Sequence, residues 1–129
     1  MVSLTERIGL HDGNLMPLFG FGCWSIEQGS NTYDAVSAAL KTGYRLVDTA
    51  QCYNNEESVG KAIQESGLPR DDVFLVTKLD PHKHGEEGVK ESLTTSLEKL
   101  GLEYVDLFLI HTPMPGKVLD SWRGILWLF

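Results

Sequence analysis

The sequence has 129 residues, of which 42% are hydrophobic and 9% aromatic, a composition typical of one soluble globular domain. Eleven Lys and Arg against eighteen Asp and Glu give a formal net charge of −7, so the chain lacks the basic field that nucleic-acid binding requires. Apolar runs such as residues 107–110 are far shorter than the ~20 residues of a membrane helix, so no membrane span is predicted.

The N-terminal residues and the cysteines indicate the cellular compartment. Residues 1–8 contain Glu6 and Arg7 and lack the apolar core of a secretory signal. Two cysteines, Cys23 and Cys52, are too few for a disulfide scaffold and have no second pair for a zinc site. The sequence therefore predicts free thiols and a cytoplasmic location.

The first predicted elements are a hairpin, a strand and a helix. Residues 7–16 place apolar side chains on both sides of Asp12-Gly13, a pair typical of a two-residue hairpin turn. Residues 18–24 are an apolar run broken by glycines, which predicts the first core strand. Asn31 is the predicted N-cap of the following helix, and Gly43 ends that helix.

Extended and helical segments alternate along the rest of the chain. The extended segments are short apolar runs, whereas the helical segments repeat apolar residues at a spacing of three and four. The predicted strands are residues 44–49, 73–79 and 104–110, and the predicted helices are residues 55–66 and 86–100, with a further helix starting at residues 120–123. This alternation indicates a parallel sheet covered by helices, and the predicted class is therefore α/β.

Two α/β architectures remain open at this point, a doubly wound sheet and a closed eight-stranded barrel. Gly20 and Gly22 match the first two glycines of the dinucleotide-binding fingerprint, but Ser25 stands where the third glycine belongs. The chain also lacks a G-x-x-x-x-G-K-[ST] phosphate loop and a G-x-S-x-G nucleophile elbow. These motifs therefore do not support P-loop or serine-hydrolase chemistry.

Three polar residues stand at the ends of three predicted strands. Asp48, Lys78 and His111 are separated by 30 and 33 residues, one strand–helix unit each time. A parallel sheet delivers all three to its carboxyl edge, where α/β proteins build their active sites. Tyr53 follows in the loop just beyond Asp48 and is predicted to join them.

These four side chains suit proton donation to a carbonyl oxygen. A nearby ammonium favours the phenolate form of a tyrosine, so Lys78 would make Tyr53 a better acid. Asp48 would orient Lys78, and His111 would hydrogen-bond the substrate oxygen. Each residue alone has an ordinary structural explanation, but their shared position at matched strand ends predicts a catalytic site.

The motifs around these residues resemble the aldo-keto reductase family. The run Gly-Tyr-Arg-Leu-Val-Asp-Thr-Ala at residues 43–50, followed after five residues by Glu56 and then by Val59 and Gly60, is similar to the family's N-terminal signature. Residues 76–79 and 106–111 resemble the family's next two blocks, and the resemblance extends from about residue 8 to residue 122.

This resemblance implies a (β/α)8 barrel that reduces aldehydes and ketones with NADP(H). It implies that Tyr53 is the general acid, that Lys78 and Asp48 tune it, and that His111 orients the carbonyl of a small-molecule substrate. Trp24 would also face the substrate.

The resemblance likewise assigns the nicotinamide end of the cofactor. Gly22, Cys23 and Trp24 match the strand-end loop that lies beside the nicotinamide in the family, and Asp48 and His111 also reach the cofactor.

The sequence departs from the family at one position near the site. Residue 112, which follows the histidine, is Thr where the family often has Trp, so substrate preference stays open.

Two other site hypotheses are weaker. His82, His84 and Glu86 suggest a metal, but they fall in a Pro/Gly loop with no further spaced ligands, and a solvated loop without metal is predicted. A thiol nucleophile built from either cysteine with His111 has no supporting signature.

The chain is short for the barrel that its motifs imply. A (β/α)8 barrel takes ~250 residues, so residues 1–129 are predicted to form a single partial aldo-keto reductase domain of about four β/α units. The segments that bind the carboxamide and the 2′-phosphate and that select substrate in the family are expected to be missing. Unpaired barrel edges predict self-association. The alternative hypothesis is a catalytically inactive fragment that acts only as an interaction or regulatory product.

Overall fold

The computed structural model describes residues 3–113 and 116–128. An antiparallel hairpin leads into a parallel sheet whose strands lie in chain order, β3-β4-β5-β6. The hairpin strands are β1 (Arg7–Gly9) and β2 (Leu15–Pro17), and the sheet strands are β3 (Phe21–Gly22), β4 (Leu46–Asp48), β5 (Phe74–Leu79) and β6 (Leu107–Ile110). The helices are α1 (Ser30–Thr42), α2 (Glu56–Glu65), α3 (Glu86–Leu100) and α4 (Val118–Leu126), with short 3-10 turns η1 (Gln51–Tyr53) and η2 (Arg70–Asp72).

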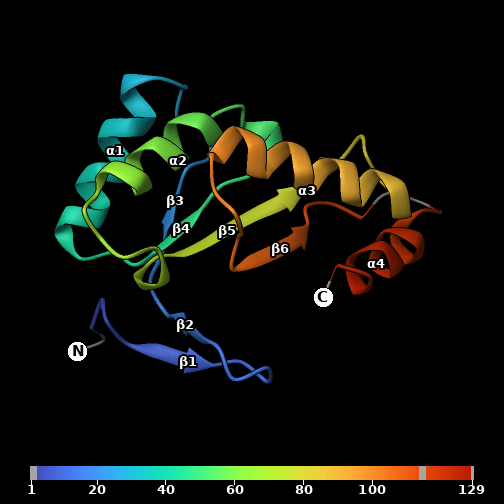
Figure 1. The fold of residues 1–129 in the computed structure, drawn as a ribbon, viewed down its shortest axis with the longest axis horizontal. Helices are drawn as coiled ribbons and strands as arrows, with labels where there is room; N and C mark the ends of the chain where they lie inside the picture. The colour runs from blue at the N-terminus through green and yellow to red at the C-terminus, as the bar shows by residue number, and fades with distance from the viewer. Residues whose placement is uncertain (1–2, 114–115, 129) are drawn as a thin grey trace.

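Helices cover one face of the parallel sheet. Figure 1 shows α1, α2 and α3 side by side above the strands, with α4 packed against α3 and the β1–β2 hairpin at the opposite end of the sheet. Apolar side chains from the strands and from α1 and α2 form the main core, which includes Val36, Leu40, Val47, Val59, Ile63 and Leu75. A second cluster of Leu79, Val89, Phe108 and Ile125 joins α3 and α4 to the sheet. The predicted α/β class is confirmed.

Most predicted elements are confirmed, with shorter strands than the apolar runs suggest. The helix predicted at residues 86–100 is α3 with the same bounds, and Gly101, at φ 64, follows its last turn. The strand predicted at residues 18–24 is wrong in extent, because only Phe21–Gly22 pairs in the sheet. The backbone N–H of Leu18 instead donates to the Glu6 carbonyl, so the start of this run continues the hairpin.

The hairpin turn is longer than predicted. The N–H of Leu10 donates to the carbonyl of Asn14 at 2.8 Å, which leaves residues 11–13 as a three-residue connection. Gly13 takes a positive φ of 90°, as the last position of a three-residue hairpin loop requires. The Asp12 carboxylate accepts the Asn14 N–H and so stabilises this longer turn.

The predicted N-cap of α1 is also wrong. Gly29, at φ 100 and ψ −143, occupies the cap position, and Asn31 lies inside the first turn. This backbone conformation favours glycine. The Gly29 N–H donates to the Ser58 hydroxyl, and the Thr32 hydroxyl donates to the Glu27 carbonyl at 2.6 Å. Tertiary contacts therefore set the start of α1, and no side-chain cap does so.

No helix within the described residues is long and apolar enough to cross a membrane.

Candidate active site

The strand register brings the predicted polar residues to one edge of the sheet. Gly22 pairs with Asp48, and Asp48 pairs with Val76, in parallel register. Lys78 lies two residues beyond Val76 on β5, and His111 directly follows β6. Gly22, Asp48, Lys78 and His111 thus lie at the carboxyl ends of their strands, the edge where active sites form in β/α proteins.

Lys78 is the centre of this group. Its Nζ atom donates to Asp48 Oδ1 at 2.7 Å and to the carbonyl oxygen of Thr49 at 2.9 Å. The third contact of the ammonium is the phenol oxygen of Tyr53, at 3.4 Å. An ammonium has three N–H donors, so these acceptors orient all of them. The Lys78 side chain is only 13% exposed, and water screens its charge weakly.

The η1 turn places Tyr53 over Lys78. The turn is closed by the Tyr53 N–H bonding to the Ala50 carbonyl, and Asn54 ends it in the left-handed region at φ 56. The Lys78 Nζ atom lies 5.0 Å from the centroid of the Tyr53 ring. The Tyr53 and His111 rings meet edge to face, with centroids 5.5 Å apart. The Tyr53 phenol therefore contacts both the Lys78 ammonium and the His111 imidazole.

His111 is held in the neutral form. Burial of the imidazole, followed by the positive charge of Lys78, lowers the pKa of His111 below its ordinary 6.5, although Asp48 and Asp80 partly oppose this shift. Its Nδ1 atom lies 3.3 Å from the Cys52 Sγ atom. A neutral imidazole offers one donor and one acceptor nitrogen, so His111 can serve as a hydrogen-bond donor at neutral pH.

The loop after β3 lies beside Asp48. The Cys23 N–H donates to the Asp48 carbonyl at 2.9 Å and extends the β3–β4 pairing by one bond. The Cys23 thiol is fully buried, and burial raises its pKa to about 12. This thiol is therefore a packing group. Trp24 is 73% exposed, and a Cβ built on Gly22 would meet no atom within 4 Å. The loop thus presents an open surface next to the polar group.

Asn55 is a buried supporting residue that no motif in the sequence indicates. Its position just before α2 suggests an N-cap, yet its side chain makes no cap hydrogen bond. The amide Nδ2 instead donates to the carbonyls of Cys23 and Ile26, at 2.9 and 3.0 Å, and Oδ1 accepts the Thr49 hydroxyl. Asn55 therefore ties the loop after β3 to the end of β4.

The loop that contains His82 and His84 contacts α4. The His84 Nδ1 atom lies 2.8 Å from the Ser121 hydroxyl, which also accepts the Gly85 N–H. Ser121 is fully buried on α4. These contacts join α4 to the loop before α3. Among the described residues, no cluster of three His, Cys, Asp or Glu side chains could hold a metal ion.

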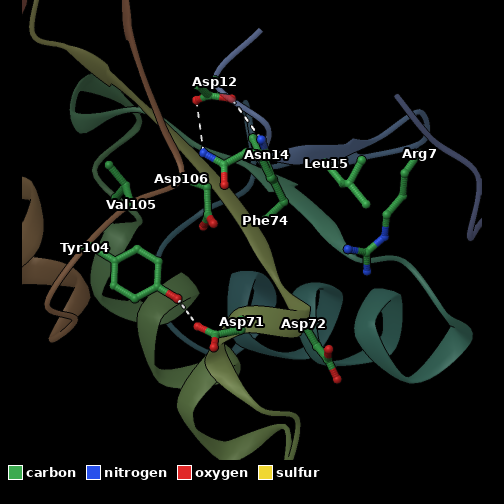
Figure 2. A pocket seen from close by; sticks show the side chains of 10 residues that line it. All are labelled: Arg7, Asp12, Asn14, Leu15, Asp71, Asp72, Phe74, Tyr104, Val105 and Asp106. Carbon is green, nitrogen blue, oxygen red and sulfur yellow. Dashed lines mark hydrogen bonds between the residues drawn. The ribbon is translucent and has the colours of Figure 1, made fainter. Parts of the chain in front are cut away.

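A cavity of about 360 Å³ lies at the other end of the sheet. Figure 2 shows it between the hairpin and the segments that precede β5 and β6. Arg7 and four aspartates line it, namely Asp12, Asp71, Asp72 and Asp106. Tyr104 closes one side by donating its hydroxyl to Asp71 at 2.6 Å. This cavity is at the amino edge of the strands and is separate from the Tyr53 group.

The parallel strands lie in chain order with helices on one face, which is the arrangement of successive β/α units in the TIM-barrel class and not that of a doubly wound sheet. Comparison with known proteins then defines the family. The sequence profile described as Aldo/keto reductase family matches residues 19–125. The chain belongs to this family.

Individual relatives support the same assignment. Glyoxal reductase from Bacillus subtilis is 43% identical over 123 residues, which cover 95% of this chain and 45% of that protein. The crystal structure of an aldo/keto reductase from Brucella melitensis superposes with a TM-score of 0.91 at 48% identity, covering 96% of this chain and 49% of that one. A Bombyx mori aldo-keto reductase in complex with NADP gives a TM-score of 0.86 at 35% identity, covering 97% and 47%. The chain thus spans about half the length of these relatives.

Proposed function

We propose that this chain carries the proton-donating site of an NADP(H)-dependent carbonyl reductase. The observation that carries the proposal is the position of one ammonium, that of Lys78, against both the Asp48 carboxylate and the Tyr53 hydroxyl. Family membership and the NADP complex of the silkworm relative support the choice of reaction and cofactor.

The residues at the carboxyl edge fit the nicotinamide end of the cofactor. Gly22 leaves open space where any other side chain would project, and Trp24 presents an exposed aromatic face nearby. A flat ring can lie against such a surface. Asp48 pairs with Gly22 beside this surface, and His111 lies at the same edge of the sheet, after β6. We therefore assign Gly22, Cys23, Trp24, Asp48 and His111 to the cofactor side of the site.

Bound NADPH would supply the hydride that carbonyl reduction requires. The residues of this chain would supply the proton and the positioning. Tyr53 would donate its hydroxyl proton to the carbonyl oxygen, while the adjacent Lys78 ammonium stabilises the phenolate that remains. Asp48 would keep Lys78 charged and in place. His111 would hydrogen-bond the same oxygen and orient the carbonyl next to Trp24.

This proposal is tested by NADPH titration and by turnover of an aldehyde. Glyoxal is a suitable probe because one relative is a glyoxal reductase. Tyr53→Phe should lower turnover at least ~10²-fold, the typical contribution of a general acid, with NADPH affinity unchanged. Tyr33→Phe is the matched control, since that hydroxyl bonds Glu65 on the outer helices. Absence of NADPH binding by the unmodified chain would overturn the proposal.

A second candidate function is that of a catalytically inactive interaction or regulatory product that self-associates. Exposed apolar side chains on and just after α4 favour it, because Leu119, Trp122 and Trp127 are 72%, 52% and 79% exposed. The edge strand β6 also exposes Leu109. Sedimentation analysis should then show dimers that Leu119→Lys dissociates, and a monomer at all concentrations would contradict this candidate.

A cytoplasmic location stays a prediction from the sequence.

A further inference from the structure

Cys52 contacts the imidazole of His111 across 59 residues of sequence. Its Sγ atom lies 3.3 Å from Nδ1, within hydrogen-bond distance for sulfur. Cys52 is the central residue of the η1 turn, and the preceding Gln51 anchors this turn by accepting the Ser92 hydroxyl at 2.7 Å. The thiol is therefore held against the imidazole by a fixed segment of backbone.

The direction of this hydrogen bond follows from the protonation states of both groups. Partial burial, and then the charge of Asp80, raises the pKa of the Cys52 thiol, so the sulfur keeps its proton at neutral pH. Burial and the Lys78 charge lower the pKa of His111, so the ring is neutral. Sulfur is a weak acceptor, whereas an unprotonated imidazole nitrogen is a good one. These properties favour donation from the thiol to an unprotonated Nδ1 over the reverse direction.

We propose that Cys52 is a positioning residue that holds His111 in the tautomer protonated on Nε2. This inference rests on the proposed function, in which His111 donates a hydrogen bond to a carbonyl oxygen. The two ring nitrogens are distinct, and the partner of one decides which of them carries the proton. With Nδ1 occupied by the thiol, Nε2 carries the N–H and faces the substrate as a donor. The opposite tautomer would present a lone pair to the carbonyl oxygen and repel it.

The charged neighbours of His111 do not determine which ring nitrogen carries the proton. Lys78, Asp48 and Asp80 affect the imidazole through their charges, and the Tyr53 ring meets it edge to face. Among the residues that the structure describes, the hydrogen-bond partner of the imidazole is Cys52. Removal of the S–H group should therefore change the tautomer while the charges around the ring stay in place.

Nitrogen-15 NMR of the histidine side chains in the 129-residue chain tests the proposal, because protonated and unprotonated ring nitrogens have well-separated shifts. His111→Asn identifies the His111 signals. The unmodified chain should show Nε2 protonated and Nδ1 unprotonated. Cys52→Val, which keeps the size and removes the donor, should shift the tautomer ratio about fivefold toward Nδ1–H, as expected for the loss of one ordinary hydrogen bond. Cys52→Ser should restore the original preference.

A chemical version of the experiment avoids any folding defect in the variants. Methyl methanethiosulfonate should block the exposed Cys52 and leave the buried Cys23 untouched, and the blocked chain should resemble Cys52→Val. Protonated Nδ1 in the unmodified chain, or a tautomer ratio that neither Cys52→Val nor the reagent changes, overturns the proposal. The readout needs no cofactor and no turnover, so an inactive chain with the expected tautomer would refute the reductase function and leave only the control of the His111 tautomer by Cys52 standing.

Discussion

The Lys78 ammonium and the Asp48 carboxylate form an ion pair of 2.7 Å between adjacent strands. Asp48 pairs with Val76 in the β4–β5 register, and side chains two residues apart share a face of a strand. Lys78, two residues after Val76 on β5, therefore projects from the same face of the sheet as Asp48. The same Nζ atom also contacts the Tyr53 hydroxyl, at 3.4 Å.

Lys78→Met should remove activity without removing the fold. The substitution keeps the length of the side chain and deletes the charge beside Tyr53, so turnover should fall about 10²-fold or more. Steady-state NADPH oxidation measures the loss, and far-ultraviolet circular dichroism checks the fold. The matched control is Lys90→Met, which breaks an exposed pair with Glu87 in α3. Equal turnover by Lys78→Met and the unmodified chain would count against a role for the ammonium.

Asn55→Asp should destabilise the chain. The carboxylate would lose both N–H donors and would face two carbonyl oxygens, those of Cys23 and Ile26, in a fully buried position. Unsatisfied buried groups of this kind cost about 2–4 kcal/mol in total. Urea unfolding measures the change. Asn54→Asp is the control, because that side chain is exposed, and its effect should stay within about 0.5 kcal/mol.

Gly60→Ala should destabilise the contact between α2 and α3. A Cβ at this position would lie 1.9 Å from the backbone carbonyl oxygen of Leu100. Alanine gains about 1 kcal/mol in helix propensity over glycine, but the helices must separate to admit it, at a cost of about 3 kcal/mol. The net loss should be about 2 kcal/mol in thermal or urea unfolding. Gly9→Ala, whose Cβ would meet its nearest atom at 4.0 Å, should change stability little.

Glu56→Gln should stabilise the chain at neutral pH. Burial raises the pKa of the Glu56 carboxyl above its ordinary 4.5, so above that pH ionisation favours the unfolded chain. Gln keeps the oxygen that accepts the Thr77 hydroxyl and carries no charge. The increase in the free energy of unfolding should be absent below pH 4.5 and present at pH 7.

Urea unfolding of both chains at pH 4 and pH 7 measures this difference. Glu103→Gln, at an exposed position, serves as the control and should show no gain at either pH. Lower stability of Glu56→Gln at pH 7 would mean that the buried carboxylate is ionised and held by partners in the folded chain.

The sequence by itself determined the α/β class and the order of elements, because the spacing of apolar residues depends only on local geometry. It also determined that Asp48, Lys78 and His111 share one edge, because parallel strands all end on the same side. The bounds of α3 and the end of α1 at Gly43 followed from local signals of the same kind.

Only the tertiary structure decided the contacts between distant segments. The start of α1 at Gly29 depends on Ser58, and the role of Asn55 depends on the position of the Cys23 loop. The Cys52 contact with His111 likewise requires η1 and the end of β6 to meet. Such contacts depend on strand register and helix packing, which align residues many positions apart, and no local spacing in the sequence encodes them.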